Sequence, residues 1–534
     1  MIKANQNVQS RLRNLFDGMQ MSRLRQLSIA IDVAALALML ASLALIFKNT
    51  SSLNFWFDES DQVLLSMGQD IWGPAHSPWG TLGKVWELSK WMNADPGGFT
   101  VIVRYAMEVL GTTPIALRCI PLFFGLAGIF CLIRCSTVFR LPLAVALLPS
   151  LLMLSNDTYR YFLFEVRAYS MESTGVIAIF LVAMFALQRQ SAWALAAFLL
   201  TVFVFASGRY SFVVYEAAIC GSILLYAMAR GDRSFRIPAQ VIGFVFVMNL
   251  VFYFGMLRFQ VIPQYILPNT LSGKSIAEIW EVFSRNLFDL IMLPKIVFLG
   301  AVAVEVVRTR ASPKKSVARD SSWRWLFFLS AYVAIAESCW VVLSFAGRIP
   351  WDYTLRWSLS EVALSGLALA GTFAVIRNWL AESPLGFVAS SPLMRCAVQI
   401  GAASIASIMM SQLSEYDRSA REFEQLYPAI TMASERGGGI GTIILDRNLW
   451  PDFRYLTEFA GISITDSVKQ GVKVVDYADL NAVAEVGLRS PRPVAFIFAT
   501  WNPDVSKRLA ALLPPEGQLN AVGNAKFTYL ISLR

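Results

Sequence analysis

Long apolar segments alternate with short polar segments along the first 412 residues of the chain. Most of these segments approach the roughly 20 consecutive apolar residues that an α-helix needs to cross the hydrocarbon core of a bilayer. The pattern therefore predicts a polytopic α-helical membrane protein with about eleven transmembrane helices. The expected spans are residues 27–47, 117–133, 141–155, 171–187, 192–206, 211–229, 238–257, 287–307, 325–345, 357–376 and 396–412.

The charges between the spans predict their orientation. Four arginines precede the first span, and the loop after residues 287–307, RTRASPKKSVARDSSWR, is the most basic in the chain. Because Lys and Arg accumulate in cytoplasmic loops, residues 1–26 are expected to form a cytoplasmic N-terminal segment. Residues 27–412 then form the transmembrane domain, with an outer loop at 48–115, and residues 413–534 lie outside. We expect a multi-pass protein of the inner (plasma) membrane whose C-terminal part is periplasmic or extracellular.

Composition agrees with a membrane protein and argues against several other classes. Of the 534 residues, 56% are hydrophobic and 16% are charged, whereas soluble domains carry about 25% charged residues. The net charge of +9 belongs to the basic loops, so no nucleic-acid partner is expected. The six cysteines lie in or beside apolar segments, and the single histidine cannot build a His-rich metal site. No signal peptide is evident, and the first span is expected to be retained.

The patterning changes after residue 412. Short apolar runs typical of buried strands alternate there with amphipathic segments of helical period. Residues 413–534 are therefore expected to fold as a small soluble α/β domain on the outer face. Its expected strands are GTIILD, PVAFIFAT and KFTYLISL, and its expected helices are DFRYLTEFAG and NPDVSKRLAALL. The stretch RGGGIG at 436–441 precedes a strand, whereas a phosphate-binding loop follows one, so a turn is favoured over a nucleotide site.

Two adjacent carboxylates stand directly after the first span, in the stretch LNFWFDES. Taken alone, Asp58 and Glu59 are as readily solvated or capping residues at a helix end as functional groups. Other ionisable residues, however, follow the outer ends of later spans, where burial is costly and usually serves a function. Short loops on a helical bundle are expected to bring them into one outer cavity. These residues are Asp61, Asp95, Asp157, Arg160, Glu165, Arg167, Arg209, Lys274, Arg348, Asp352 and Arg356.

Acids and arginines together suit the transfer of a sugar from a lipid phosphate. A carboxylate accepts the proton of an attacking hydroxyl, and arginines hold a phosphate leaving group and offset its growing charge. Simpler roles compete, because an arginine at a helix end often anchors the helix at the interface, and Glu165 with Arg167 suits a structural ion pair. The tryptophans of the outer loop fit an interfacial aromatic belt, with sugar stacking as the alternative. They are Trp56, Trp72, Trp79, Trp86 and Trp91.

The order of these motifs resembles the membrane glycosyltransferases of the GT-C superfamily, in the branch of the protein O-mannosyltransferases and the lipid A aminoarabinose transferases. WFDES is similar to the acidic pair after that family's first span, FEVRAYSMES to its Glu-x-Arg-x-Tyr segment, and YTLRW to its late Arg–aromatic pair. The stretch DPGGFTVIVRYAMEVLGTTPIALRCIPLFFGLAGIF at 95–130 is similar to the turn and helix that enter its second span. Asp95 and two glycines stand where that family often has His and Pro, which leaves the substrate contacts of this turn open.

The resemblance covers roughly residues 50–400 and implies a role for each matching residue. Asp58 would be the general base that activates an acceptor hydroxyl, and Glu59 would orient that hydroxyl. Transfer would occur by direct displacement with inversion at the anomeric carbon. The donor phosphate would be contacted by Arg167, Arg356, Arg160 and Lys274, and the sugar or acceptor pocket would be lined by Glu165, Tyr169, Asp95 and Asp157.

The expected function is that of an enzyme, a glycosyltransferase that uses a polyprenyl-phosphate sugar and modifies a cell-envelope glycan, lipid or protein. No cofactor is required, although a divalent cation at Asp58 and Glu59 is an alternative. A transporter or flippase for a lipid-linked saccharide would instead place ionisable groups at mid-membrane, in broken helices. An oligosaccharide ligase with diphosphate-linked donors is a further alternative, and a non-catalytic scaffold would leave the acidic pair without a role. Neither the sugar nor the acceptor follows from the sequence.

Overall fold

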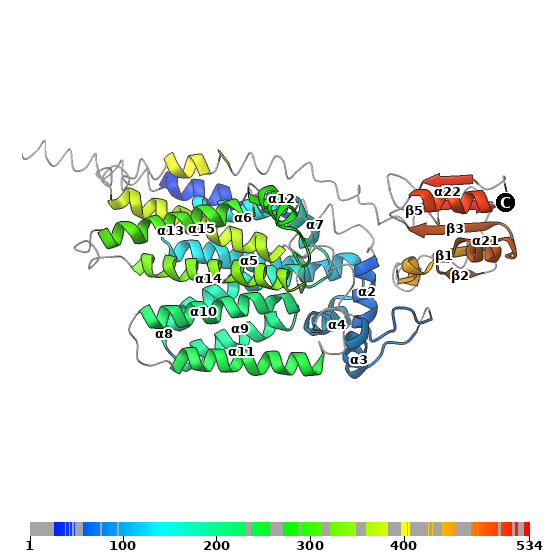
Figure 1. Cartoon of the computed structure of the whole chain (residues 1–534), viewed down its shortest axis with the longest axis horizontal. Helices are drawn as coiled ribbons and strands as arrows, with labels where there is room; N and C mark the ends of the chain where they lie inside the picture. Colours follow the sequence, from blue (N-terminus) through cyan, green and yellow to red (C-terminus); the bar gives the residue numbers. More distant parts are fainter. Residues whose placement is uncertain are drawn as a thin grey trace, which may run out of the picture.

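A body of long helices is followed by a small mixed sheet (Figure 1). The computed structural model describes residues 57–74, 77–92, 96–229, 236–256, 271–287, 291–311, 321–348, 359–382, 503–514, 518–521 and 528–533, most of 26–47, 397–405, 441–454 and 471–499, and residues 426 and 430.

Six helical elements of the described part are long and apolar enough to cross a membrane. This confirms the expected class, a polytopic α-helical protein with a C-terminal α/β domain, while the described residues do not establish the number of eleven spans. The six are α5 (Pro114–Val138), α8 (Tyr169–Arg189), the 3-10 turn η1 (Tyr210–Phe212) with α10 (Val213–Ala229), α11 (Arg236–Gly255), α14 (Ser321–Phe345) and α15 (Leu359–Glu382). The shorter apolar helices α6 (Leu143–Ser155) and α9 (Ala192–Ala206) lie between them in the chain.

The start of α9 agrees with the expected boundary, whereas the expected span at 287–307 begins at a different place in the structure. Helix α9 covers the predicted span at 192–206. The Ser191 side chain caps its start by accepting a hydrogen bond from Ala194 N. The predicted span at 287–307 is wrong at its start. Residues up to Leu287 belong to a separate amphipathic helix, α12 (Ile276–Leu287), and α13 (Leu293–Ala311) begins only afterwards. Its charged residues set α12 apart from the apolar spans.

Helices α8 and α15 form the centre of the helical body. The most apolar stretch of each is 83% buried, compared with 22% for α11. Helix α8 contacts α5, α9 and α15, and α15 also contacts α6 and α13. Helix α11 instead presents large apolar side chains outward, among them Phe246, Val251 and Phe254. Such an apolar outer surface suits contact with lipid rather than water.

One end of the helical body carries short helices, and we call it the α2 end (Figure 1). They include α2 (Phe57–Ser66), α3 (Leu82–Met92), α4 (Gly98–Leu110) and α7 (Asp157–Leu163). Helix α2 ends at a turn in which Gly68 adopts a φ of 70°, a conformation that glycine reaches without strain. The chain then returns to this turn, where Gly80 N donates to Met67 O at 2.7 Å.

The described C-terminal residues build a five-stranded sheet with the order β2-β1-β3-β5-β4. Strand β1 pairs in parallel with β2 and β3, whereas β5 pairs antiparallel with β3 and β4. The two helices pack with Ile444, Phe496 and Phe498 in one apolar core. These elements are β1 (Thr442–Asp446), β2 (Val472–Val475), α21 (Leu480–Leu488), β3 (Val494–Ala499), α22 (Pro503–Leu512), β4 (Gln518–Ala521) and β5 (Thr528–Leu533).

The C-terminal domain is hydrogen-bonded to the segment that follows α2. Arg454 is fully buried, and its guanidinium donates to Asp70 O at 2.5 Å, Gln69 Oε1 at 2.6 Å and Ser77 Oγ at 3.0 Å. Trp450 adds a fourth bond, from its indole Nε1 to Gly73 O at 3.0 Å. Buried arginines are rare unless their donors are satisfied. Arg454 therefore links the sheet domain to the α2 end through buried hydrogen bonds.

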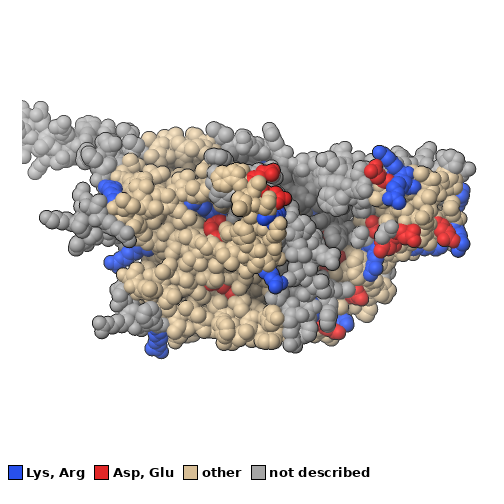
Figure 2. All heavy atoms as spheres, viewed as in Figure 1, with Lys and Arg blue, Asp and Glu red and all other residues tan. Residues whose placement is uncertain are grey.

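The surface charges are distributed as a membrane-spanning body requires. Figure 2 shows few charged side chains along the flank of the helical body in this view, whereas basic side chains lie at its left end and both signs gather on the C-terminal domain. A flank with few charges is compatible with hydrocarbon, where an ionised group is costly. The charged ends are compatible with water on both sides.

Replacing Arg454 with leucine should loosen the contact between the C-terminal domain and residues 69–77. The substitution leaves buried acceptors without donors, and each such group costs about 1–3 kcal/mol. We expect amide hydrogen exchange in residues 69–77 to accelerate roughly tenfold or more. Arg489→Leu is the control, because Arg489 is exposed at the end of α21 and, among the described residues, forms an ion pair only with Glu485 of that helix. Unchanged amide hydrogen exchange in residues 69–77 of the Arg454 variant would contradict this linking role.

Candidate functional site

Helix α2 buries both residues of the acidic pair in its first turn. Asp58 is 6% exposed and Glu59 is 0% exposed, so neither is the solvated residue that the simpler interpretation describes. The N-terminal turn of a helix favours negative charge, because the free backbone N–H groups and the helix dipole point toward it. This effect is modest, however, and two buried carboxylates also require specific partners.

Glu59 is held by a buried arginine. Arg118 of α5 donates from Nη2 to Glu59 Oε2 at 2.7 Å and from Nε to Oε1 at 3.2 Å, and both side chains are 0% exposed. The amide of Val166 donates to the same Oε1 at 3.0 Å. Such a two-pronged contact is the strongest geometry for an Arg–carboxylate pair. Glu59 therefore joins α2, α5 and the segment between α7 and α8 at one point.

Sequence reasoning assigned no role to Arg118. It lies in the TPIALRCIP stretch that starts α5, whose similarity to the family turn was noted without singling out the arginine. The available signal was an arginine on an otherwise apolar helix, because such a residue inside a span requires a partner. The identity of the partner was not accessible, since Glu59 lies 59 positions earlier in the chain.

Helix α7 and the segment that follows it bring three more predicted residues to this end of the body. Arg167 is half-buried, and its Nη1 donates to the backbone carbonyl of Asp58 at 3.3 Å. Glu165 is fully buried and Arg160 is 8% exposed. Asn156 caps the start of α7, because its Oδ1 accepts a hydrogen bond from Tyr159 N at 2.9 Å. Arg167 thus contacts the main chain of Asp58, while the catalytic and phosphate-binding roles expected for the two side chains stay predictions.

Asp61 lies one turn after Asp58, on the same face of α2. Its Oδ1 is buried and has no hydrogen-bond partner among the described residues. Burial raises the pKa of Asp61 to about 7, and the positive charge of Arg167 acts in the opposite direction. The sequence identified Asp61 as one of the outer acids but gave it no role. Its carboxyl therefore changes protonation state near neutral pH, a property shared by many functional carboxyls.

Tyr169 starts α8 and is almost fully buried. The guanidinium of Arg209 lies 4.4 Å from its ring centroid, and the ring of Phe162 meets it edge-on at 5.4 Å. Arg209 also pairs with Glu172 at 3.3 Å, and the Ser211 hydroxyl donates to Glu172. Tyr169 is therefore packed within a polar cluster at the α2 end, and its predicted role in a sugar pocket stays a prediction.

The remaining predicted residues are less well placed. Lys274 is half-buried in the turn before α12, where its amide donates to Leu271 O at 3.3 Å. Asp157 begins α7, and only its main chain is described. Arg356 and Asp95 lie outside the described residues.

A second polar cluster is buried deeper among the helices. Lys295 of α13 donates to Glu361 of α15 at 2.7 Å and also contacts Glu337 of α14. Tyr215 of α10 donates to the other oxygen of Glu361 at 2.5 Å. Because ionised groups inside a bundle persist only when paired, this cluster holds four helices together. None of its four residues was a candidate from the sequence, because each lies within an apolar segment.

The acidic pair fits a divalent cation poorly. Glu59 already faces the guanidinium of Arg118 and accepts a hydrogen bond from Val166 N, so its oxygens are directed to other donors. The positive charge of Arg118 also opposes a second cation beside Glu59. Among the described residues, no three His, Cys, Asp or Glu side chains gather as metal ligands.

Comparison with known proteins finds similarity only at the level of solved structures. No family model matches the chain, and no curated protein matches it. The structure of ArnT from Cupriavidus metallidurans bound to undecaprenyl phosphate is similar with a TM-score of 0.47 at 11% identity, covering 93% of this chain and 97% of that chain. The apo structure of the same protein gives a TM-score of 0.49 at 12% identity, with the same coverage. At these values the similarity carries no argument about activity.

Removing one partner of the Glu59–Arg118 pair should destabilise the protein strongly. Glu59→Met or Arg118→Met leaves one buried charge alone, which typically costs about 3–5 kcal/mol. The double variant should recover much of that loss, because an apolar pair needs no desolvation of charge. Thermal unfolding of the purified protein in detergent measures all three.

The exposed Lys84–Glu87 pair of α3 is the matched control, and its removal should cost about 0–1 kcal/mol. Single variants of Glu59 and Arg118 as stable as this control would contradict the assignment of the pair as the main contact between α2 and α5.

Asp61 should make stability fall as pH rises from about 4 to about 7. In this window the folded protein keeps the Asp61 proton, because burial raises its pKa to about 7, while the unfolded chain releases the proton near the ordinary pKa of 3.8. The folded state thus binds more protons, and stability decreases with pH. Asp61→Asn removes this contribution, so the wild type should gain on the variant as the pH is lowered. Thermal midpoints across this range test the difference, with the exposed Asp504→Asn as control.

Proposed function

We propose that the protein transfers a sugar from a polyprenyl-phosphate donor to an acceptor hydroxyl at the α2 end of the helical body. The observation that carries the proposal is the contact between Arg167 and the backbone of Asp58, with Glu59 engaged by Arg118. An acid and an arginine of different elements meet at the end of an apolar body, where a lipid carrier would present its head group. A soluble sugar nucleotide would not require such a location.

The two acids receive different roles in this proposal. Glu59 accepts hydrogen bonds from Arg118 and Val166, so it acts as a positioning residue that fixes the first turn of α2. Asp58 precedes it on the same turn and is assigned as the general base. It accepts the proton of the acceptor hydroxyl while the oxygen of that hydroxyl attacks the anomeric carbon. The bond from that carbon to the phosphate oxygen breaks, and the configuration inverts.

The leaving group is a polyprenyl phosphate with growing negative charge. Arg167 is half-buried beside Asp58, and we assign it to the phosphate oxygens, because a guanidinium presents donors in the geometry that phosphate accepts. Arg160 is buried in the preceding helix and is a second candidate. Lys274 and Arg356 keep the phosphate-binding role that the sequence resemblance implies. No cofactor takes part in this scheme.

The orientation is part of the proposal. The basic loops predicted from the sequence would face the cytoplasm, and the α2 end with the C-terminal domain would face the periplasm or the cell exterior. The acceptor, a cell-envelope glycan, lipid or protein, would then arrive from the aqueous side. The enzyme would reside in the inner (plasma) membrane.

A transporter or flippase of a lipid-linked saccharide is the second candidate. The buried Lys295–Glu337–Glu361 cluster favours it, because ionisable groups within a helical bundle often mark a transport pathway. Against it, Lys295 directly contacts both carboxylates. Helices α13 and α15 begin only two residues before Lys295 and Glu361, so the cluster lies at helix ends and not at a break within a span. A diphosphate-dependent ligase would use similar arginines without needing Asp58.

Asp58→Asn should abolish sugar transfer while donor binding persists. Loss of a general base typically lowers the rate by about 10²–10⁴-fold. The assay uses protein in lipid nanodiscs with a panel of polyprenyl-phosphate sugars, and it measures donor binding and donor consumption separately. Glu87→Gln on the neighbouring helix α3 is the control, because Glu87 is exposed and its ion pair in the described part of the chain is with Lys84.

Each outcome distinguishes the candidates. A donor bound by both forms and consumed only by the wild type supports the base assignment and identifies the sugar. Equal consumption by the Asp58 variant contradicts it. Movement of the intact donor across proteoliposomes without transfer would favour the transporter.

A further inference from the structure

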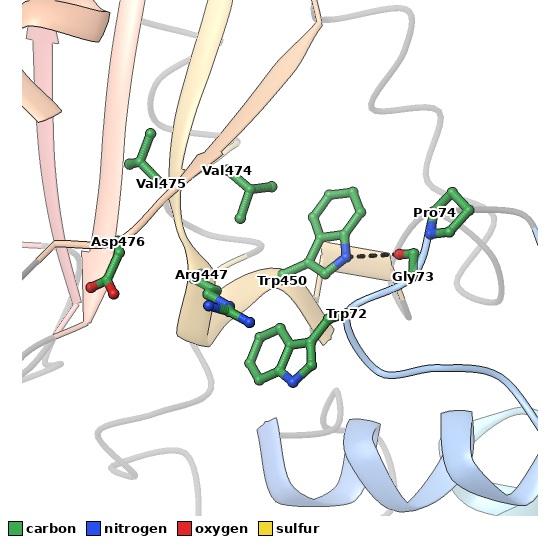
Figure 3. A pocket seen from close by; sticks show the side chains of 8 residues that line it. All are labelled: Trp72, Gly73, Pro74, Arg447, Trp450, Val474, Val475 and Asp476. Carbon is green, nitrogen blue, oxygen red and sulfur yellow. Dashed lines mark hydrogen bonds between the residues drawn. The ribbon is translucent and has the colours of Figure 1, made fainter. Parts of the chain in front are cut away.

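A cleft of about 480 Å³ lies between the segment after α2 and the C-terminal domain (Figure 3). Trp72 and Pro74 line it from the first side, and Arg447, Trp450, Val474 and Asp476 line it from the second. This volume falls within the range of about 300–1,000 Å³ that small-molecule sites usually occupy. The sequence placed Trp72 in an interfacial belt, with sugar stacking as the alternative, and the structure places it in this cleft.

The side chains that line the cleft are held in place by contacts with one another and with neighbouring residues. Trp450 stacks on Phe453 with ring centroids 5.5 Å apart and planes 14° apart, and its Nε1 is bound to Gly73 O. The guanidinium of Arg447 lies 4.9 Å from the centroid of Trp72. The buried hydrogen bonds of Arg454 hold the two sides together. Two aromatic side chains and an arginine are thereby preorganised around one hollow, which lowers the entropic cost of binding.

The chemistry of the walls suits a saccharide. A sugar ring presents apolar C–H faces, which pack against the electron-rich faces of indoles, and hydroxyls, which both donate and accept hydrogen bonds. Arg447 supplies donors and Asp476 supplies acceptors at the same cleft. Trp72 remains 39% exposed despite its size, so its apolar surface is available to a ligand.

Other ligand classes match these walls less well. A nucleotide or a polyphosphate would need several cations or a glycine-rich loop, whereas the charged residues that line the cleft are one arginine and one aspartate. A lipid tail would need an uninterrupted apolar groove, and the charged side chains of Arg447 and Asp476 interrupt it. We propose that this cleft is a saccharide-binding site, which holds the glycan part of the acceptor.

The position of the cleft links it to the α2 end. The segment with Trp72 and Gly73 continues directly from α2, which carries Asp58 and Asp61, and is bound to the C-terminal domain by Arg454. A glycan held here would be tethered at the same end of the helical body as the acidic residues, which raises its effective concentration there. The acceptor role rests on the proposed transferase function, whereas saccharide binding by the cleft does not.

Comparing Trp72→Ala with Trp79→Ala tests the site. Both tryptophans are 39% exposed, both lie on the same outer segment, and both carry an arginine over the ring, Arg447 for Trp72 and Arg104 at 4.6 Å for Trp79. Only Trp72 lines the cleft. Full-length protein in nanodiscs is titrated with soluble neutral and uronic-acid-containing oligosaccharides, and binding is followed by calorimetry and saturation-transfer NMR.

We expect at least one oligosaccharide to bind the wild type and the Trp79 variant equally, and to bind Trp72→Ala roughly tenfold or more weakly. Arg447→Gln, which keeps the indoles, should weaken binding as well and guards against a folding defect in the Trp72 variant. Absence of binding by every oligosaccharide, or equal loss in both tryptophan variants, overturns the proposal.

The Asp58→Asn variant separates this inference from the proposed function. It should bind the oligosaccharide like the wild type, because Asp58 does not line the cleft. If no donor is consumed by any form while Trp72 remains necessary for saccharide binding, the transferase proposal fails and the site stands. If the donor is consumed normally and no oligosaccharide binds, the site fails and the transferase proposal stands.

Discussion

The ion pair between Glu59 and Arg118 is the constraint on which the α2 end depends. Both side chains are fully buried, so neither charge is tolerable without the other. The pair, with the amide of Val166 as third partner, fixes three elements that are far apart in the chain. It thereby sets where α2 begins and where the carbonyl of Asp58 meets Arg167. The candidate catalytic geometry is a consequence of this structural contact.

The same principle operates at two further places in the helical body. Arg209 joins Tyr169 and Glu172, and Lys295 joins the carboxylates of α14 and α15. Each cluster joins a cation to partners on another helix: Arg209 to two residues of α8, and Lys295 of α13 to carboxylates of α14 and α15. Surroundings of low polarity strengthen this attraction and make an unpaired charge costly. Apolar packing alone discriminates weakly between helices in a membrane. These polar contacts therefore supply the specificity with which the helices choose their neighbours.

Much of the fold was accessible from the sequence, because a bilayer permits few ways to bury a backbone. The apolar runs located α5, α8, α9 and α15 closely, and the strand pattern found β1, β3 and β5. The motif resemblance singled out Asp58 and Arg167, but it did not specify the contact between Arg167 and the main chain of Asp58. Arg118 and Arg454 were missed, since their roles depend on partners 59 and 385 positions away. The predictions for Arg356 and Asp95 concern residues outside the described part of the chain.

The indole of Trp450 has a consequence for how the protein can be observed. Its Nε1 belongs to the C-terminal domain, while the carbonyl that it binds belongs to the segment continuing from α2. The emission of an indole changes when it loses such a hydrogen bond and its surroundings change. The fluorescence of Trp450 thus depends on the contact between the C-terminal domain and the α2 end. A rearrangement of the α2 end during turnover would change this fluorescence without an added label.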